Sequence, residues 1–393
     1  MQTLALGASA ASFVVGGGRD IELAANAIQP PVAPGAQLRL TDPDGEELGI
    51  AIADPENGKL RMIATAADGF PTISGALLGW RVERAIKWRK RLGIAPPDGG
   101  DHAYRLIHGA GDGLPGFACD VLGSTAVVYA YGEALRPLGK QLAEAVVGFA
   151  RLKGAVVKLR QRGSADDVAQ DIVGMAPDER MVVTEHGIPF EVHPLGGLNH
   201  GLFTDMREHR KGLARFAAGA RVLNLFSYTG ALSVACARAG AATVTSVDTS
   251  AGVNAWASGN FGRSGLAGDA RYKFETGDAA RYLARAARDS ERYDLVLVDP
   301  PSTSSAGGGS WALGRDYPAL IAKAAAVIPA DGLLWLAANT HELGSLAKLA
   351  HKGLRLAGRT AALLEQGGLP PEYPTLPAQP ADRYLQVCLF RLA

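Results

Sequence analysis

The clearest pattern of apolar and polar positions along the chain lies between Arg221 and Asp248. It predicts a fully buried parallel strand at residues 222–226, a turn at 227–230, a helix of small residues at 231–239 and a second buried strand at 243–247. Asp248 follows the second strand directly. In an open α/β sheet, a strand, a turn and a helix that lead to a carboxylate about 20 residues further on build a nucleoside pocket. The pattern therefore predicts such a pocket, with an ordinary βα turn as the alternative.

The turn distinguishes between nucleotide cofactors. A dinucleotide fingerprint requires the spacing G-x-G-x-x-G, whereas the stretch Ser227-Tyr228-Thr229-Gly230 holds a single glycine. Without the other glycines, the backbone cannot approach a pyrophosphate closely, which favours S-adenosylmethionine over NAD. We expect Asp248 to bind the ribose hydroxyls of this cofactor. A dehydrogenase is the alternative if the single glycine misleads.

The remainder of the C-terminal part continues the alternation of strands and helices. Apolar runs predict strands at 272–276, 293–298 and 333–338, a helix at 253–260, and a closing hairpin at 360–365 and 384–391. This alternation is typical of a doubly wound parallel sheet, in which ligands bind outside the carboxyl ends of the strands. Polar or aromatic residues at these strand ends predict one site: Tyr228, Asp248, Asp278, Asp299 and Asn339. A further helix is expected after residues 200–210, with Thr204 or Asp205 as its N-cap.

The N-terminal part has a different pattern. Short strands at 38–40, 48–53 and 60–63, separated by turns rich in Asp, Pro and Gly, predict a small all-β, barrel-like unit over residues 1–72. Such a unit is a binding accessory or, alternatively, a scaffold. Residues 72–92 then predict a helix in which Arg84, Lys87 and Arg91 share one face, while Trp88 lies on another with Ala85 and Leu92. This face suits an RNA backbone, with a merely solvated face as the equal alternative.

The stretch from 101 to 192 predicts a second α/β segment. Strands are expected at 104–108, 127–130 and 155–159, and a helix at 137–153. We find no catalytic constellation in this segment. His102, His108 and His186 lack the spacing of metal ligands, so we interpret them as surface or core histidines and predict no metal site.

Composition limits the number of domains, the cellular setting and the kinds of partner that the chain can have. A chain of 393 residues with 47% apolar residues can form roughly two or three domains with real cores. Three scattered cysteines fit a reducing, cytoplasmic setting, and the first 18 residues lack the basic start of a signal peptide. The net charge of +1 neither requires nor excludes nucleic acid.

Several motifs together resemble a known family. They are HGLFTDMREHR (200–210), VLNLFSYTGALSVACARAGA (222–241), the strand ends at Asp248 and Asp278, and VLVDPP (296–301). The chain resembles the class I methyltransferases of large-subunit ribosomal RNA that carry a PUA domain, which include cytosine-5 and guanine-7 enzymes. Upstream, YRLIHGAGDGLPGFACD (104–120) resembles the central domain of this family, and residues 35–64 resemble its PUA module.

The resemblance implies three domains and a set of site residues. The domains are a PUA-like RNA-binding domain at 1–72, a central α/β domain at 73–189 and a Rossmann-like methyltransferase domain at 190–393. S-adenosylmethionine would be bound by residues from several strand ends: Asp205, Arg207, Phe226, Ser227, Tyr228, Gly230, Asp248, Asp278, Ala279 and Asp299. Asp248 would hold the ribose, Asp278 the adenine amino group, and Asp299 would lie next to the transferred methyl group. The implied substrate is 23S ribosomal RNA, and a homodimer is plausible.

Cysteine placement bears on the type of reaction. Methylation at carbon 5 of cytosine requires a thiolate that adds to the ring, and this cysteine would belong beside Asp299 or at the end of the next strand. Those positions hold Ser302 and Asn339. A ring nitrogen needs only alignment with the sulfonium, and an Asn at this place resembles the guanine-7 branch. We therefore favour base N-methylation, with Asp299 and Asn339 as positioning groups. Asn339 is equally well explained as a turn residue.

The chain also departs from the family pattern. An aromatic residue near the DPP loop and a lysine after it are replaced by a run of Ser, Thr, Ala and Gly at 302–309, and Trp311 either stacks on the base or anchors the loop. These departures bear on the substrate more than on the cofactor. Two other functions therefore stay open: a small-molecule N- or O-methyltransferase, and a non-catalytic RNA-binding or ribosome-assembly protein.

Overall fold

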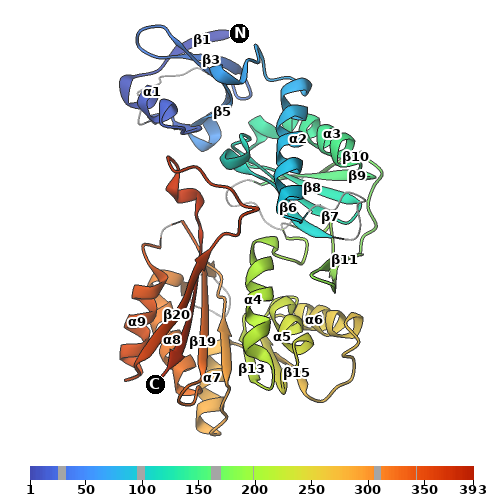
Figure 1. Ribbon diagram of the computed structural model, residues 1–393, viewed down its shortest axis with the longest axis vertical. Helices are drawn as coiled ribbons and strands as arrows, with labels where there is room; N and C mark the ends of the chain where they lie inside the picture. The colour runs from blue at the N-terminus through green and yellow to red at the C-terminus, as the bar shows by residue number, and fades with distance from the viewer. Residues whose placement is uncertain (25–31, 95–101, 161–169, 198, 305–310, 342) are drawn as a thin grey trace. The chain divides into compact units, whose positions relative to one another are not determined.

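A computed structural model describes residues 1–24, 32–94, 102–160, 170–197, 199–304, 311–341 and 343–393 (Figure 1). The chain divides into two compact units. The first comprises residues 1–184, 192–200 and 370–382, and the second comprises 185–191, 201–369 and 383–393. The division into three domains at residues 72 and 189 stays a prediction.

The second unit is built on a sheet with seven strands in its described part, in the order β15-β14-β13-β16-β19-β21-β20. The strands are β13 (Arg221–Leu225), β14 (Thr243–Asp248), β15 (Tyr272–Thr276), β16 (Leu295–Val298), β19 (Leu333–Asn339), β20 (Ala361–Gly368) and β21 (Leu385–Leu392). Strands β15, β14, β13, β16 and β19 pair in parallel, whereas β21 runs antiparallel to both β19 and β20. This confirms the predicted doubly wound α/β fold and its closing hairpin.

Helices cover both faces of this sheet (Figure 1). Neighbours in one row are α4 (Arg207–Ala217), α5 (Ala231–Arg238) and α6 (Ala251–Arg263), and neighbours in the other are α7 (Ala279–Arg288), α8 (Leu313–Ala326) and α9 (Leu346–Leu356). An apolar face directs each helix onto the sheet, as α7 illustrates. Its buried residues recur at the spacing of one helix face: Ala279, Tyr282, Leu283 and Ala286. The sheet and the α7–α9 row enclose one apolar core.

The strand order reverses between β13 and β16. Strand β13 has β14 on one side and β16 on the other, and the chain visits β14 and β15 before it reaches β16. Helices therefore leave β13 and β16 toward opposite faces, which opens a crevice at the carboxyl ends of these two strands. Several predicted site residues end or follow strands at this edge: Phe226, Ser227, Tyr228, Asp248, Asp278, Asp299 and Asn339.

The first unit contains two further sheets. One has the order β1-β3-β4-β5-β2, from β1 (Gln2–Ala5), β2 (Asp20–Glu22), β3 (Gln37–Thr41), β4 (Glu47–Asp54) and β5 (Lys59–Thr65). The other has the order β10-β9-β8-β7-β6, from β6 (Ala103–His108), β7 (Phe117–Leu122), β8 (Thr125–Ala130), β9 (Gly154–Leu159) and β10 (Gln170–Gly174). In the described ranges β1 and β2 do not pair with each other, so the closed, PUA-like barrel is not shown.

The remaining elements are short or belong to the first unit. Its helices are α1 (Ala8–Val15), α2 (Gly75–Arg91) and α3 (Arg136–Ala150). Two-stranded sheets are formed by β11 (Met181–Glu185) with β12 (Ile188–Val192), and by β17 (Thr303–Ser304) with β18 (Trp311–Ala312). The 3-10 turns are η2 (Pro55–Asn57), η3 (Ala66–Asp68), η4 (Gly109–Asp112), η5 (Glu133–Leu135), η6 (Thr204–Met206) and η8 (Pro380–Asp382). In the described ranges, no helix has the length and apolar character needed to cross a bilayer.

One apolar core joins the two sheets of the first unit. Ile50 and Ile63 of the N-terminal sheet pack in the same cluster as Leu77 and Val82 of α2 and Leu106 of β6. The predicted helix at 72–92 is thus confirmed as α2, and its buried face serves both sheets. Of the basic face predicted on this helix, Arg84, Lys87 and Arg91 are exposed.

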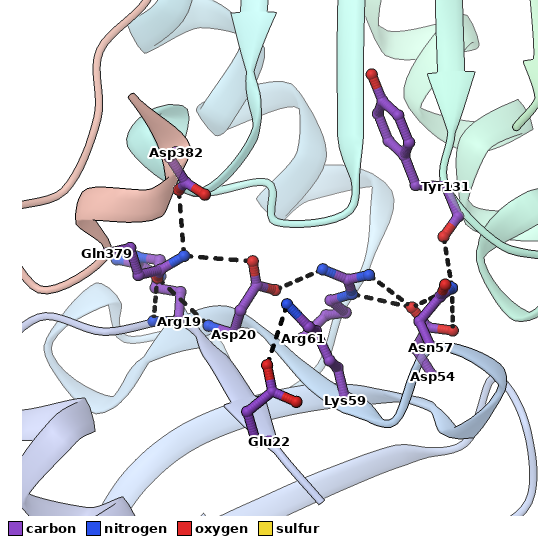
Figure 2. A network of polar contacts seen from close by, with 10 residues as sticks. All are labelled: Arg19, Asp20, Glu22, Asp54, Asn57, Lys59, Arg61, Tyr131, Gln379 and Asp382. Atoms are coloured by element: carbon purple, nitrogen blue, oxygen red, sulfur yellow. Dashed lines mark hydrogen bonds and ion pairs between the residues drawn. The ribbon is translucent and has the colours of Figure 1, made fainter. Parts of the chain in front are cut away.

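A buried polar network ties the segment 370–382 into the first unit (Figure 2). Arg61 donates to Asp20 Oδ1 at 2.8 Å and to Asp54 Oδ2 at 2.9 Å. The amide of Gln379 donates to Asp20 Oδ2 at 3.3 Å, and its oxygen accepts from the backbone N–H of Arg19 at 2.6 Å. A residue close to the end of the chain therefore completes the environment of the N-terminal sheet.

The network predicts that two cations of β5, Arg61 and Lys59, differ strongly in how much each contributes to the free energy of unfolding. Arg61→Met leaves two carboxylates without their cation, so we expect the free energy of unfolding to fall by about 3–5 kcal/mol. Lys59→Met breaks only the exposed pair with Glu22, whose atoms are 3.3 Å apart, and should cost at most about 1 kcal/mol. Urea-induced unfolding of the full chain measures both. Equal losses would show that the buried pairing contributes nothing beyond a surface ion pair.

Candidate functional site

The turn that follows β13 has an unusual backbone. Phe226 and Tyr228 have φ angles of 58° and 47°, and Gly230 has a φ of 76°. Left-handed backbone is easy for glycine but costs energy for residues with a β-carbon. Two such residues within three positions are tolerated only where the surroundings fix them, which is typical of ligand-binding sites.

Asp248 provides that fixation from the end of the neighbouring strand. Its Oδ2 accepts a hydrogen bond from the backbone N–H of Tyr228 at 3.0 Å, and its Oδ1 accepts from the N–H of Ser250 at 3.1 Å. The backbone carbonyl of Asp248 accepts from the N–H of Gly277 at 2.9 Å. One residue therefore links the turn after β13 to the segment that leads into Asp278.

Asp278 and Ala279 begin the next helix. Asp278 is the N-cap of α7, where its Oδ1 accepts from the N–H of Arg281 at 2.8 Å. Its side chain is exposed at the sheet edge, and Ala279 behind it is buried. Asp278 therefore has a structural role in capping α7 as well as its predicted role in binding adenine.

Asp299 follows β16 at the crevice. Burial, aided by the carboxylate of Asp205 and opposed by Arg210, raises the pKa of this carboxyl group to about 7. The loop around Asp299 is anchored by Tyr317, whose hydroxyl lies 2.8 Å from the Val298 carbonyl oxygen and 2.9 Å from that of Ala337. Asp205 and Asp299, far apart in sequence, are thus brought close enough to interact.

The predicted N-cap of the helix after residue 204 is wrong. Residues Thr204–Met206 form a 3-10 turn, and α4 begins at Arg207 with Met206 as its N-cap. The carboxylate of Asp205 is engaged elsewhere, because its Oδ2 accepts from the Tyr384 hydroxyl at 3.1 Å. A tertiary partner has replaced the local capping bond.

Two further predicted site residues lie at the start of α4 and at the end of β19. Arg207 donates to Glu208 Oε1 at 2.6 Å. Asn339 ends β19 beside β16, with an exposed side chain. Their places at the start of α4 and at the strand edge agree with the pattern, and their roles stay predictions.

Aromatic side chains surround the turn, among them Phe203 and Trp256, which the sequence analysis did not assign. The ring of Phe203 lies 5.2 Å from that of Tyr228, the ring of Trp256 lies 6.4 Å from it, and Trp311 lies 6.3 Å from Phe226. The indole N–H of Trp311 donates to the Pro301 carbonyl oxygen at 2.8 Å, so this residue does anchor the loop. Residues 305–310 of the loop lie outside the described ranges.

Comparison with known proteins adds the decisive observation. Residues 118–391 match the profile of a family described as S-adenosylmethionine-dependent methyltransferase. The chain belongs to this family. It is a methyltransferase that depends on S-adenosylmethionine, as the strand-end pattern predicts.

Named relatives and solved structures agree with this assignment. The methyltransferase is 35% identical to "Ribosomal RNA large subunit methyltransferase K" of Neisseria meningitidis over 67% of its own length and 74% of that protein. It is 28% identical to "Ribosomal RNA large subunit methyltransferase I" of Cronobacter sakazakii over 90% of each chain. In fold it resembles a putative methyltransferase of Streptococcus mutans over the full length of both chains, with a TM-score of 0.86 at 24% identity. A similar structure, with a TM-score of 0.87 at 23% identity, holds SAH.

The residues of the methyltransferase fit this cofactor. The hydroxyl of Ser227 is buried in the turn, and within the described ranges it has no hydrogen-bond partner. A buried polar atom without a partner is costly, so a polar ligand at this turn would satisfy it. The strained turn, the orphaned hydroxyl and the carboxylate of Asp248 together form a polar cradle suited to a nucleoside.

The raised pKa of Asp299 predicts a pH dependence of stability. Between the ordinary carboxyl pKa of 3.8 and about 7, the folded protein binds more protons than the unfolded chain. The free energy of unfolding must therefore fall as pH rises through this window and level off above it. Asp299→Asn removes the titrating group, so its stability relative to wild type should increase across the same window, on the order of 2–4 kcal/mol.

Urea-induced unfolding across this pH window measures the difference. The matched control is Asp331→Asn, since Asp331 has an 83% exposed side chain and a positive φ that asparagine tolerates. The control should follow the wild-type pH profile. A stability difference between Asp299→Asn and wild type that does not change with pH would contradict burial as the cause.

Proposed function

We propose that this chain methylates a base of 23S ribosomal RNA at a ring nitrogen, in the manner of a guanine-7 methyltransferase and without a covalent cysteine. The observation that carries the substrate is the 35% identity to a protein named as a large-subunit ribosomal RNA methyltransferase, of which the chain covers 74%. A second relative carrying the same kind of name is matched over 90% of each chain. The cytoplasm, where ribosomal RNA is modified, is the proposed location.

The cofactor is proposed to lie along the carboxyl ends of the central strands. S-adenosylmethionine supplies a methyl group on a positively charged sulfur. Asp248 would hold the ribose hydroxyls, Asp278 the adenine amino group, and the turn from Phe226 to Gly230 with Ala279 would line the nucleoside. Asp205 and Arg207 would complete the cradle. Two carboxylates facing a sulfonium are favourable electrostatically, which supports Asp205 and Asp299 as neighbours of the transferred group.

Asp299 and Asn339 are proposed as positioning groups for the target base. Nitrogen 7 of guanine has no proton to be removed, so the reaction needs alignment rather than a general base. With a pKa of about 7, Asp299 exists near neutrality both as a hydrogen-bond donor and as an acceptor. Either form can hold a base edge, and the amide of Asn339 offers a donor and an acceptor as well.

The cysteines support nitrogen rather than carbon as the methylated atom. Cys119, Cys236 and Cys388 are free and buried. Burial raises the pKa of Cys236 to about 12 and that of Cys388 to about 11, and it raises the pKa of Cys119 as well. A thiol with so high a pKa is a poor nucleophile at neutral pH, so none of the three fits a covalent addition to cytosine.

A homodimer is also proposed, through the edge strand β20. Residues 362–367 of this strand are exposed on both faces, with Leu363 45% and Leu364 44% exposed. A long edge strand that exposes apolar side chains is normally covered by a partner strand or surface. A second copy of the chain provides such a cover. The N-terminal sheet, in turn, is proposed as a PUA-like RNA-binding module.

The function predicts a specific loss of cofactor binding. Asp248→Ala should weaken binding of S-adenosylhomocysteine by at least about tenfold, since a hydrogen bond to a charged group contributes about 1.5–3 kcal/mol. Calorimetric titration measures this, with Glu144→Ala at an exposed position of helix α3 as the matched control. Transfer of tritiated methyl groups to 23S ribosomal RNA from cells that lack the protein then tests the substrate. Label on free nucleosides or small molecules, with none on the RNA, would contradict the RNA proposal.

The dimer predicts a change of mass in solution. Leu363→Lys places a charge in the middle of the exposed edge and should convert the protein to monomers. Leu356→Lys is the control, because this leucine is 63% exposed but ends helix α9 and is not part of the edge strand. Analytical ultracentrifugation measures the mass of each variant. A wild-type protein that sediments as a monomer would contradict the dimer.

A further inference from the structure

Two arginines of the first unit lie against one tryptophan, and a third arginine lies close to these two. Arg81 and Arg84 belong to α2, and each guanidinium carbon lies 4.7 Å from the centre of the Trp80 ring. Arg19 immediately precedes β2, and its positive charge lowers the pKa of Arg81. Its place is fixed because the backbone N–H of Arg19 donates to the side chain of Gln379 (Figure 2).

The cluster carries more positive charge than its surroundings balance. Arg81 donates to Asp68 Oδ2 and, at 2.9 Å, to the Ile63 carbonyl oxygen. Arg19 donates to the Met62 carbonyl oxygen at 3.4 Å, and within the described ranges neither Arg19 nor Arg84 makes an ion pair. Among the described contacts, Asp68 is therefore the one carboxylate that pairs with any of the three guanidinium groups, and it pairs with Arg81.

This arrangement is energetically unfavourable by itself. Burial, followed by the charge of Arg19, lowers the pKa of Arg81 to about 10. Burial also lowers the pKa of Arg19, a shift that Asp68 opposes and to which Arg84 adds. The Nε of Arg81 is buried and, in the described part of the chain, lacks a hydrogen-bond partner. Removing guanidinium groups from water without supplying counter-charges costs energy, which an anionic ligand would offset.

We propose that Arg19, Arg81 and Arg84 form a phosphate-binding cluster for the RNA backbone. A purely structural ion pair would need only Arg81 and Asp68, and would leave no reason to hold Arg19 and Arg84 close by. Planar guanidinium groups are suited to phosphate oxygens. The Trp80 ring already carries two guanidinium groups, so the cluster binds phosphate and does not stack on a base. This inference rests on the proposed RNA substrate and locates one contact with it.

The salt dependence of RNA binding tests the cluster. In filter binding of in vitro-transcribed 23S ribosomal RNA over a series of KCl concentrations, the logarithm of the binding constant falls linearly with the logarithm of salt concentration. Each phosphate contact contributes about 0.7 to this slope for single strands and about 0.9 for duplex. Arg84→Ala and Arg19→Ala should each make the slope shallower by about this amount, and the double variant by about twice as much. Arg84→Lys, which keeps the charge, should restore most of the slope.

The control variant is Arg39→Ala. It removes one positive charge from the same unit, but Arg39 is already paired with Glu47, so its slope should stay that of wild type. Binding of S-adenosylhomocysteine and the melting temperature should be unchanged in Arg84→Ala, because Arg84 is exposed and lies in the other unit from the cofactor residues. If Arg19→Ala does not fold, Arg84→Ala alone decides.

The outcomes separate the cluster from the function. Wild-type protein that binds the RNA with a salt slope shared by Arg84→Ala, Arg19→Ala and Arg39→Ala would overturn the cluster and leave the RNA proposal intact. Wild-type protein that binds S-adenosylhomocysteine but shows no salt-dependent RNA binding would overturn the RNA proposal and the cluster with it.

Discussion

The hydrogen bond from the Tyr228 backbone N–H to the Asp248 carboxylate is the constraint on which the second unit's site depends. It holds a left-handed turn at the end of β13 against the end of β14, at 3.0 Å. Because β13 also pairs in register with β16, the same turn is fixed relative to Asp299, two strands away from Asp248 in the sheet. A shift of one residue in either register would turn each strand's side chains to the opposite face. The positions of the site residues are therefore fixed by the pairing of the three parallel strands β14, β13 and β16.

The sequence predicted the second unit well because buried parallel strands are read directly from apolar runs. Residues 272–276 were predicted as a strand and form β15, and the run at 333–338 differs from β19 by one residue. Strand β7 was not predicted. Its sequence contains Asp120, a residue that single-sequence patterns exclude from a buried strand. Asp120 is tolerated because Arg105 on the adjacent strand donates to it at 2.7 Å, a partner that only the pairing of β6 and β7 reveals.

The candidate site was predictable to the extent that topology alone defines it. In a doubly wound sheet the residues after consecutive strands meet at one edge, so Asp248, Asp278 and Asp299 could be chosen without knowing their contacts. Tyr384, which donates to Asp205, could not, because it lies 179 residues away, immediately before the hairpin strand β21. The failed N-cap at Asp205 has the same cause. A carboxylate chooses between a local N–H and a distant hydroxyl according to tertiary packing, about which spacing carries no information.

The segment 370–382 shows why neither unit corresponds to one continuous piece of chain. It lies in sequence between β20 and β21 of the second unit, yet it belongs to the first. There the fully buried side chain of Arg89 donates to Asp112 and to the Glu372 carbonyl oxygen at 2.6 Å, and Gln379 accepts the backbone N–H of Arg19. A fragment that ended at residue 200 would lack the acceptors from Glu372 and Gln379, at a cost of about 1–3 kcal/mol for each buried donor left unpaired. The connection between two antiparallel strands of the methyltransferase sheet is thus part of the core of the N-terminal unit. The stability of the first unit consequently depends on residues that are synthesised only after most of the second unit.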